Sequence, residues 1–237
     1  MATPGFNTTH YLEQKLQSLQ NNPQTANQYA DYTVDELEAD ILEAGLTAES
    51  HYEQYGFNES QYDENGDPAG LLSPNAFFNA DEYVAAKAQA LINNGDVVGD
   101  VNFGELTQAE AETQFETIWS SVGTGNLYDH YTTYGEGEGI NPSNSFDISA
   151  YIEAKAAQAE LTVPQLRGKL GEAGLGILEH YEDFGKDENF VTEAELSVPE
   201  GEQVGGANAG ETFTLTTSID AGADFTGTSG NDRFTGD

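Results

Sequence analysis

The sequence predicts an all-α protein made of three repeated helical units, with about three helices in each, followed by a short β segment. Two observations predict this fold. An opening of Phe, a Tyr five residues later and a Lys four residues after that occurs three times. A later motif, His-Tyr-x-x-aromatic-Gly, also occurs three times, once after each opening. Self-similarity of this kind is the signature of a repeat architecture, in which neighbouring units bury each other's apolar faces.

Each opening indicates the start of a helix. The repeated residues are Phe6, Tyr11 and Lys15; Phe78, Tyr83 and Lys87; and Phe146, Tyr151 and Lys155. Asn7, Asn79 and Asp147 stand where an N-cap side chain accepts a free backbone N–H. Phe then falls at N′ and Tyr at N4, the two positions of a hydrophobic staple. We expect helices over 8–20, 80–92 and 148–159, with each lysine stem lying along an aromatic ring.

A second helix is expected in each unit. Capping-box spacing occurs at Thr33 with Glu36, at Thr107 with Glu110 and at Thr162 with Gln165. Gly45 and Gly174, each followed by leucine, match the C′ position of a Schellman motif.

The third helix of each unit carries the His-Tyr-x-x-aromatic-Gly motif. The three copies of the motif begin at His51, His130 and His180 and end at Gly56, Gly135 and Gly185. We expect these three glycines to end their helices with positive φ. An acidic residue follows three positions after each glycine, at Glu59, Glu138 and Glu188.

These features divide the chain into three parts. The helical domain covers residues 1–192, with units of about 1–74, 75–142 and 143–192. A Gly-rich linker is expected over 193–210, and a β segment over 211–237, where 212–216 alternates like a strand.

Composition excludes several classes of function. The 237 residues include 42 acidic and 7 basic side chains, which gives a net charge of −35. Such a chain repels nucleic acids and anionic membranes. It has no cysteine, and no apolar run long enough to span a bilayer. Its N-terminus also lacks the basic and then apolar pattern of a secretory signal peptide.

The last residues resemble a known family. Gly227-Thr228-Ser229-Gly230-Asn231-Asp232-Arg233-Phe234-Thr235 fits the calcium-binding nonapeptide G-G-x-G-x-D-x-U-x, with Thr228 in place of the second glycine. Residues 212–237 therefore resemble the entry into the β-roll of RTX (repeats-in-toxin) proteins, truncated after its first repeat. They also resemble the junction between the N-terminal anchoring region and the β-roll of Gram-negative RTX surface-layer proteins. The helical units are similar to segments of large secreted bacterial RTX proteins, so the chain looks like the N-terminal region of a surface-layer or adhesin-like member of this family. This resemblance implies type I secretion, which uses no N-terminal signal, a place on the bacterial cell surface, and a chain that is the N-terminal part of a longer protein.

Few side chains in the sequence indicate chemistry. The three repeated histidines fall in separate units, and none has a second histidine at helical spacing, so packing or capping explains them better than metal binding or catalysis. No nucleophile motif, phosphate-binding loop or dinucleotide fingerprint occurs, and we expect no enzyme activity. Asp63, Asn65 and Asp67 place oxygen ligands at alternate positions, as the first half of a calcium loop does. These three residues and, separately, Asp232 are the candidate Ca²⁺ ligands. The alternative for 63–67 is an exposed acidic turn that binds no metal.

The resulting hypothesis is a non-enzymatic, calcium-dependent attachment and assembly domain of an RTX surface-layer protein. Its partners would be surface polysaccharide, lipopolysaccharide or copies of itself in a homo-oligomer. The alternative is a helical spacer in a secreted RTX enzyme or adhesin whose active region lies elsewhere. The residues that follow in the full-length protein would discriminate between the two.

Overall fold

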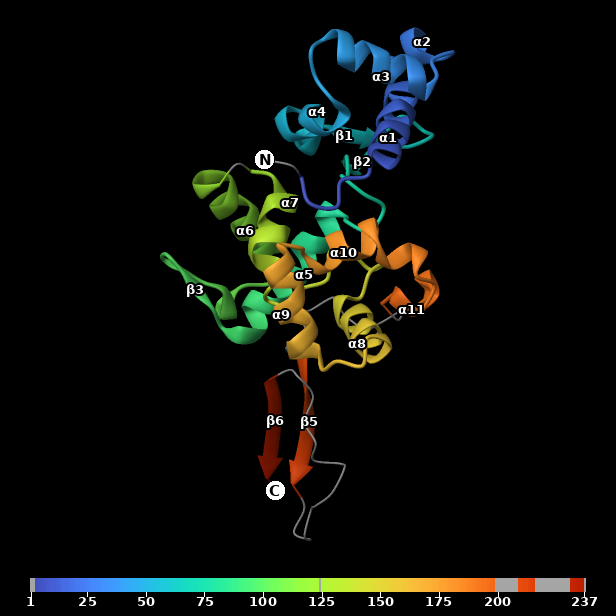
Figure 1. Ribbon diagram of the computed structural model, residues 1–237. Coiled ribbons are helices and arrows are strands. Elements are labelled where there is room, and N and C mark those ends of the chain that lie inside the picture. Colours follow the sequence, from blue (N-terminus) through green and yellow to red (C-terminus); the bar gives the residue numbers. More distant parts are fainter. Residues whose placement is uncertain (1–2, 124, 199–208, 216–230, 237) are drawn as a thin grey trace.

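A computed structural model describes residues 3–123, 125–198, 209–215 and 231–236, the last two ranges by their backbone only (Figure 1). Within these residues the protein is mostly helical, with eleven α-helices and three small two-stranded pairs. The all-α class is therefore correct for the described chain. No described helix combines the length and apolar character needed to cross a bilayer.

The first segment lies at the top of the molecule in Figure 1. It contains four helices and one antiparallel hairpin: α1 Thr8–Asn21, α2 Ala26–Tyr29, α3 Val34–Glu43, α4 Ala48–Gln54, β1 Ser60–Tyr62 and β2 Pro68–Leu71. The hairpin packs next to the last turn of α1, where the Ser18 hydroxyl donates to the Ser60 carbonyl.

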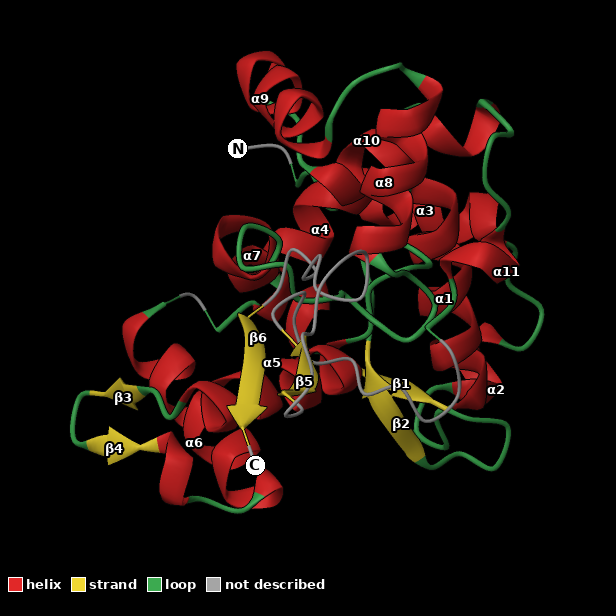
Figure 2. Ribbon diagram, turned by 90° about the horizontal axis from the view of Figure 1, so that it is seen from below, coloured by secondary structure: helices red, strands yellow, loops and turns green. Residues whose placement is uncertain are grey.

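The second segment follows without a break. Its elements are α5 Ala80–Asn94, the short antiparallel pair β3 Val97–Val98 and β4 Val101–Asn102, α6 Gln108–Val122, α7 Leu127–His130 and a π-helical turn over Tyr131–Gly135. The β3–β4 pair projects from the body of the molecule (Figure 2).

The third segment contains α8 Ile148–Gln158, α9 Val163–Ala173, α10 Ile177–Asp183 and α11 Glu193–Leu196. Strands β5 Ala209–Leu215 and β6 Asn231–Gly236 then pair in parallel and extend away from the helices (Figure 1). The helical part reaches further than the predicted boundary at 192, because α11 has its own capping box and Leu196 is fully buried in the core. Residues 199–208 of the predicted linker lie outside the described residues, and its last two residues, 209 and 210, belong to β5.

The predicted helix caps are present. Asn7, Asn79 and Asp147 each accept a backbone N–H of the first turn of α1, α5 and α8. The predicted capping boxes also form at the start of α3, α6 and α9. Gly45 and Gly174 have φ of 82° and 72°, and the leucine after each donates back into its helix, as a Schellman motif requires.

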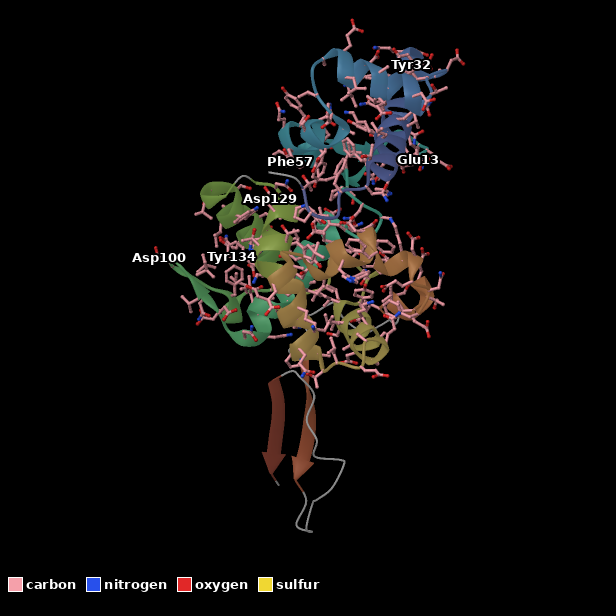
Figure 3. All side chains as sticks on the ribbon, viewed as in Figure 1. Glu13, Tyr32, Phe57, Asp100, Asp129 and Tyr134 are labelled. Carbon is pink, nitrogen blue, oxygen red and sulfur yellow. The ribbon has the colours of Figure 1, made fainter. Side chains whose placement is uncertain are left out.

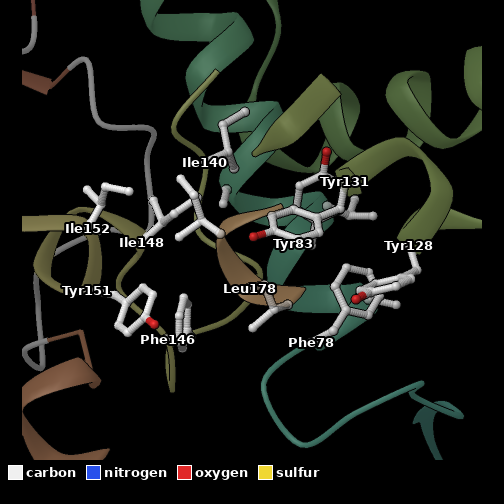
Figure 4. Packing of buried hydrophobic residues seen from close by; sticks show 14 of the residues in the cluster. Phe78, Tyr83, Tyr128, Tyr131, Ile140, Phe146, Ile148, Tyr151, Ile152 and Leu178 are labelled. Atoms are coloured by element: carbon white, nitrogen blue, oxygen red, sulfur yellow. The ribbon is translucent and has the colours of Figure 1, made fainter. Parts of the chain in front are cut away.

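The core has two parts. One cluster involves only the first segment and includes Tyr11, Leu37 and Tyr52. The other runs through the second and third segments together, from Phe78 to Leu196. Figure 4 shows side chains of both later segments meeting in this shared cluster. The first segment is therefore packed largely around itself.

Similar backbone hydrogen bonds join the end of each segment to its own beginning. The N–H groups of Asn7 and Asn79 donate to the carbonyls of Pro74 and Pro142, at 2.9 and 3.1 Å. The N–H of Asp147 donates to the Leu196 carbonyl at 2.6 Å. Each first helix is therefore anchored at its N-cap by the connection that ends a segment.

Candidate functional site

The same aromatic cluster occurs three times. The tyrosine hydroxyl of each opening is hydrogen-bonded to Nδ1 of the histidine in the later motif. The oxygen-to-nitrogen distances are 2.7, 2.6 and 2.7 Å for Tyr11–His51, Tyr83–His130 and Tyr151–His180. The phenylalanine of each opening packs on the same tyrosine, with ring centroids 5.5, 5.7 and 5.7 Å apart for Phe6, Phe78 and Phe146. The predicted hydrophobic staple is thus present at every opening.

Burial keeps both partners of each pair neutral. It lowers the pKa of His51 and His180, and it lowers the pKa of His130 to about 4, with the nearby lysine acting in the same direction. Burial also raises the pKa of Tyr83 well above its ordinary value. A neutral tyrosine and a neutral imidazole share this hydrogen bond through Nδ1. This bond fixes the ring orientation of each histidine.

The glycine of each motif is required for space and not for its backbone angle. Gly56, Gly135 and Gly185 do not have positive φ, so that prediction is wrong. A Cβ at these positions would lie 2.2, 2.3 and 2.1 Å from the hydroxyl oxygens of Tyr11, Tyr83 and Tyr151. Only glycine lets the tyrosine hydroxyl pass the chain to reach its histidine.

The repeated lysines form ion pairs across each segment. Their Nζ atoms lie 2.5 Å from a carboxylate oxygen of the acid that follows the glycine, in the pairs Lys15–Glu59, Lys87–Glu138 and Lys155–Glu188. The lysine side chains are only 10–12% exposed. Both positions are repeated in the sequence, but nothing there indicated that they pair, and we expected the lysines only to lie along aromatic rings.

The second aromatic of each motif remains half exposed. Tyr55, Tyr134 and Phe184 are 54%, 50% and 50% exposed, whereas the tyrosine one position after each histidine is buried. Each half-exposed ring contacts its histidine, with ring centroids 5.6, 5.2 and 5.7 Å apart. The three rings, Tyr55, Tyr134 and Phe184, are called the platform rings below.

The second segment extends its platform with a larger aromatic group. The Trp119 ring packs edge-on against His130, with centroids 4.7 Å apart, and lies 6.3 Å from Tyr134. The Trp119 indole N–H donates to the Asn126 carbonyl, which fixes the indole. Figure 3 shows Tyr134 on the side of the molecule from which the β3–β4 pair projects.

A polar cavity of about 410 Å³ lies where the segments meet. His10, Asn79, Glu82 and Asn144 are among its lining residues. Glu82 is already used there, because its carboxylate accepts the Asn144 backbone N–H at 2.7 Å. Glu82 therefore serves the junction between the second and third segments.

The proposed calcium ligands lie in the turn between β1 and β2. Asp63 Oδ1 accepts the backbone N–H groups of Asn65 and Asp67, each at 2.9 Å, and Asp63 Oδ2 accepts the Asn65 side-chain amide at 3.2 Å. These bonds lower the pKa of Asp63. Both carboxylate oxygens thus already accept hydrogen bonds within the turn, and no three His, Asp or Glu side chains gather at metal-binding geometry in the described residues. The side chain of Asp232, in β6, lies outside the described residues.

Comparison with known proteins gives no match, whether to family models, to curated sequences or to solved structures.

Proposed function

We propose that this chain is a non-enzymatic attachment and assembly domain of a type I-secreted RTX surface protein, and that it binds surface polysaccharide or lipopolysaccharide and copies of itself. In this proposal the three segments are copies of one structural unit. The repeated Tyr–His bond, Lys–Glu pair and close-fitting glycine support that view, because three independent contacts recur with nearly the same distances.

The single observation that carries the binding function is the exposure of the platform rings. Every other aromatic of the repeated cluster is wholly or mostly buried, yet Tyr55, Tyr134 and Phe184 stay half exposed at the same motif position. Leaving an apolar ring in water at one repeated position gives no folding advantage. Aromatic side chains dominate the energetics of interfaces, so exposed rings repeated at one position favour a binding role.

The histidines have a structural role in this proposal. Each one bonds a buried tyrosine inside its own segment, and burial keeps each imidazole neutral near pH 7. Nδ1 of each imidazole is engaged by that tyrosine, so this nitrogen is not free to take a substrate proton. Attachment thus explains the cluster better than catalysis.

The parallel pair β5–β6 supports the RTX part of the proposal. Phe213 pairs with Phe234 and Thr214 with Thr235, in parallel register. In a β-roll, successive turns of the chain place their strands side by side in parallel. The calcium sites of that β-roll would involve Asp232 together with a following turn, and the turn at Asp63 is a separate candidate.

A retention assay tests the proposal. The purified chain is added to Gram-negative cells stripped of their surface coat, with and without calcium, and the bound fraction is measured. Cells treated with periodate, which cleaves the vicinal diols of sugars, are the control for polysaccharide, and sedimentation of the chain alone measures self-association. We expect calcium-dependent retention that periodate removes. The proposal would be contradicted if the chain is not retained on stripped cells that have not been treated with periodate and is also a monomer in solution.

A further inference from the structure

We infer that the platform rings are stacking sites for neutral sugar rings, one site on each of the three segments. This inference rests on the proposed function, because it names the chemistry by which the domain would hold a polysaccharide. One face of a pyranose presents mostly C–H groups, and this face packs against a flat aromatic ring while the hydroxyl groups stay in water.

The ring, and not a hydroxyl group, is common to the three positions. Two of the segments have tyrosine and the third has Phe184, which has no hydrogen-bonding group. If the position served to donate or accept a hydrogen bond, phenylalanine would not fulfil it. The shared property is therefore a flat apolar face.

Each platform ring is held in place before any ligand arrives. Its histidine neighbour is fixed by the bond from Nδ1 to a buried tyrosine hydroxyl, and the two rings contact each other at interplanar angles of 56°, 49° and 50°. A ring that is already ordered loses little conformational freedom on binding. Such a surface suits weak contacts that are repeated along a polymer, since linked sites gain affinity by avidity.

The charge distribution identifies the ligand as neutral. The lysine of each cluster is mostly buried and paired with its glutamate at 2.5 Å, so it is not available for an acidic sugar. The whole chain carries a net charge of −35. An anionic polysaccharide would be repelled by the charge of the chain as a whole, whereas neutral hexose units would not.

The second segment has the largest platform. Trp119 adds its indole next to His130 and Tyr134, and Tyr134 itself lies within the π-helical turn Tyr131–Gly135. Single π-helical turns are rare and frequently mark functional positions. We therefore expect Tyr134 to contribute more binding than Tyr55 or Phe184.

The test compares ring substitutions with a matched control. Tyr55→Leu, Tyr134→Leu and Phe184→Leu, singly and together, keep an apolar side chain over the histidine but remove the flat face. Leu42→Ala changes another exposed apolar side chain, 56% exposed, that lies away from the motif. Neutral mannan and dextran oligosaccharides and anionic polygalacturonate are titrated by NMR, and each variant is also measured in the cell retention assay.

We expect the aromatic signals of the platform rings to shift with a neutral oligosaccharide and not with polygalacturonate. Each single substitution should weaken binding about three- to tenfold, with the largest loss at Tyr134, while Leu42→Ala binds as the parent chain does. Melting temperatures close to that of the parent would show that the variants are folded. If a variant unfolds, the NMR shifts of the platform-ring signals in the parent chain show by themselves whether the rings bind the oligosaccharide.

The two proposals fail in different ways. If the parent chain is retained on cells and the triple variant is retained equally well, the platform rings are not the site, but the attachment function stands. Ring signals that no neutral oligosaccharide shifts at millimolar concentration, or that polygalacturonate shifts more strongly, would also overturn this inference. Absence of retention for the parent chain counts against the attachment function itself.

Discussion

At the scale of single residues, the close contact between Gly135 and Tyr83 is the most restrictive feature of the repeated cluster. An added Cβ would lie 2.3 Å from the tyrosine hydroxyl oxygen and 2.9 Å from its ring. We expect Gly135→Ala to lower the free energy of unfolding by about 1–3 kcal/mol, because the ring must shift and lose its histidine partner. Chemical denaturation measures this change.

Gly168 offers the matched control for that substitution. It lies in α9 with no atom within 4 Å of an added Cβ, so Gly168→Ala should be neutral or stabilise by up to about 1 kcal/mol. Equal effects of the two substitutions would show that the contact with Tyr83 does not require glycine at 135.

The buried histidines make stability depend on pH. Burial lowers the pKa of His130 to about 4, from an unfolded value of about 6.5. Between these values the unfolded chain binds more protons than the folded chain, so stability falls as the pH is lowered from about 6.5 towards 4. Protonation of the many acidic groups relieves charge repulsion and acts in the opposite direction.

The contribution of His130 is therefore measured as a difference. We expect the melting temperature of the parent chain to fall more steeply between pH 6.5 and pH 4 than that of His130→Gln, whose side-chain amide can still form a hydrogen bond with Tyr83. Parallel melting curves for the two proteins would show that His130 does not titrate differently on folding.

At the scale of elements, the ion pair between Lys87 and Glu138 joins α5 to the chain after the π-helical turn. The lysine side chain is 10% exposed and the glutamate 44% exposed. We expect a double-mutant cycle with Lys87→Met and Glu138→Gln to give a coupling free energy of about 1 kcal/mol, since the pair is only partly desolvated. Glu138→Gln alone should cost more than the double variant, because it leaves a buried lysine unpaired. A coupling free energy near zero would show that the ion pair does not stabilise the contact between these elements.

The β1–β2 turn allows a test of calcium binding. If Asp63, Asn65 and Asp67 hold Ca²⁺, millimolar calcium should raise the melting temperature more than magnesium at equal ionic strength, because Ca²⁺ accepts irregular oxygen coordination and Mg²⁺ does not. Asp63→Asn with Asp67→Asn should abolish the difference. Equal shifts with the two ions would mean that the acidic groups are only screened, as sodium at matched ionic strength would also show.

At the scale of the whole molecule, the two separate core clusters predict two cooperative units. Leu37 is buried in the cluster of the first segment. Leu37→Ala should destabilise that segment by about 2–5 kcal/mol and increase hydrogen exchange over α1 to α4. We expect exchange in α5, α8 and α10 to stay unchanged, because their side chains belong to the other cluster.

Leu166→Ala, in the shared cluster, is the complementary variant. It should increase exchange in the second and third segments together. If Leu37→Ala increased exchange equally throughout the described residues, the protein would unfold as a single unit despite its divided core.

The amino-acid sequence by itself determined the starts of the helices and the members of the repeated cluster. N-caps such as Asn79, capping boxes such as Thr33 with Glu36, and Schellman glycines such as Gly174 act within one or two turns of chain. The staple between Phe78 and Tyr83 is equally local. Short-range patterns of this kind can be read directly, because the groups that interact are near neighbours in the sequence.

Only the tertiary structure decided how those residues meet. Lys87 and Glu138 are 51 positions apart, and Tyr83 and His130 are 47 apart, so no local spacing indicated either pair. The need for Gly135 arises from the same long-range approach of Tyr83, which is why the prediction of a positive φ failed. Packing between distant parts of the chain also decides which ring of each motif stays exposed. It likewise gives the first segment a core of its own.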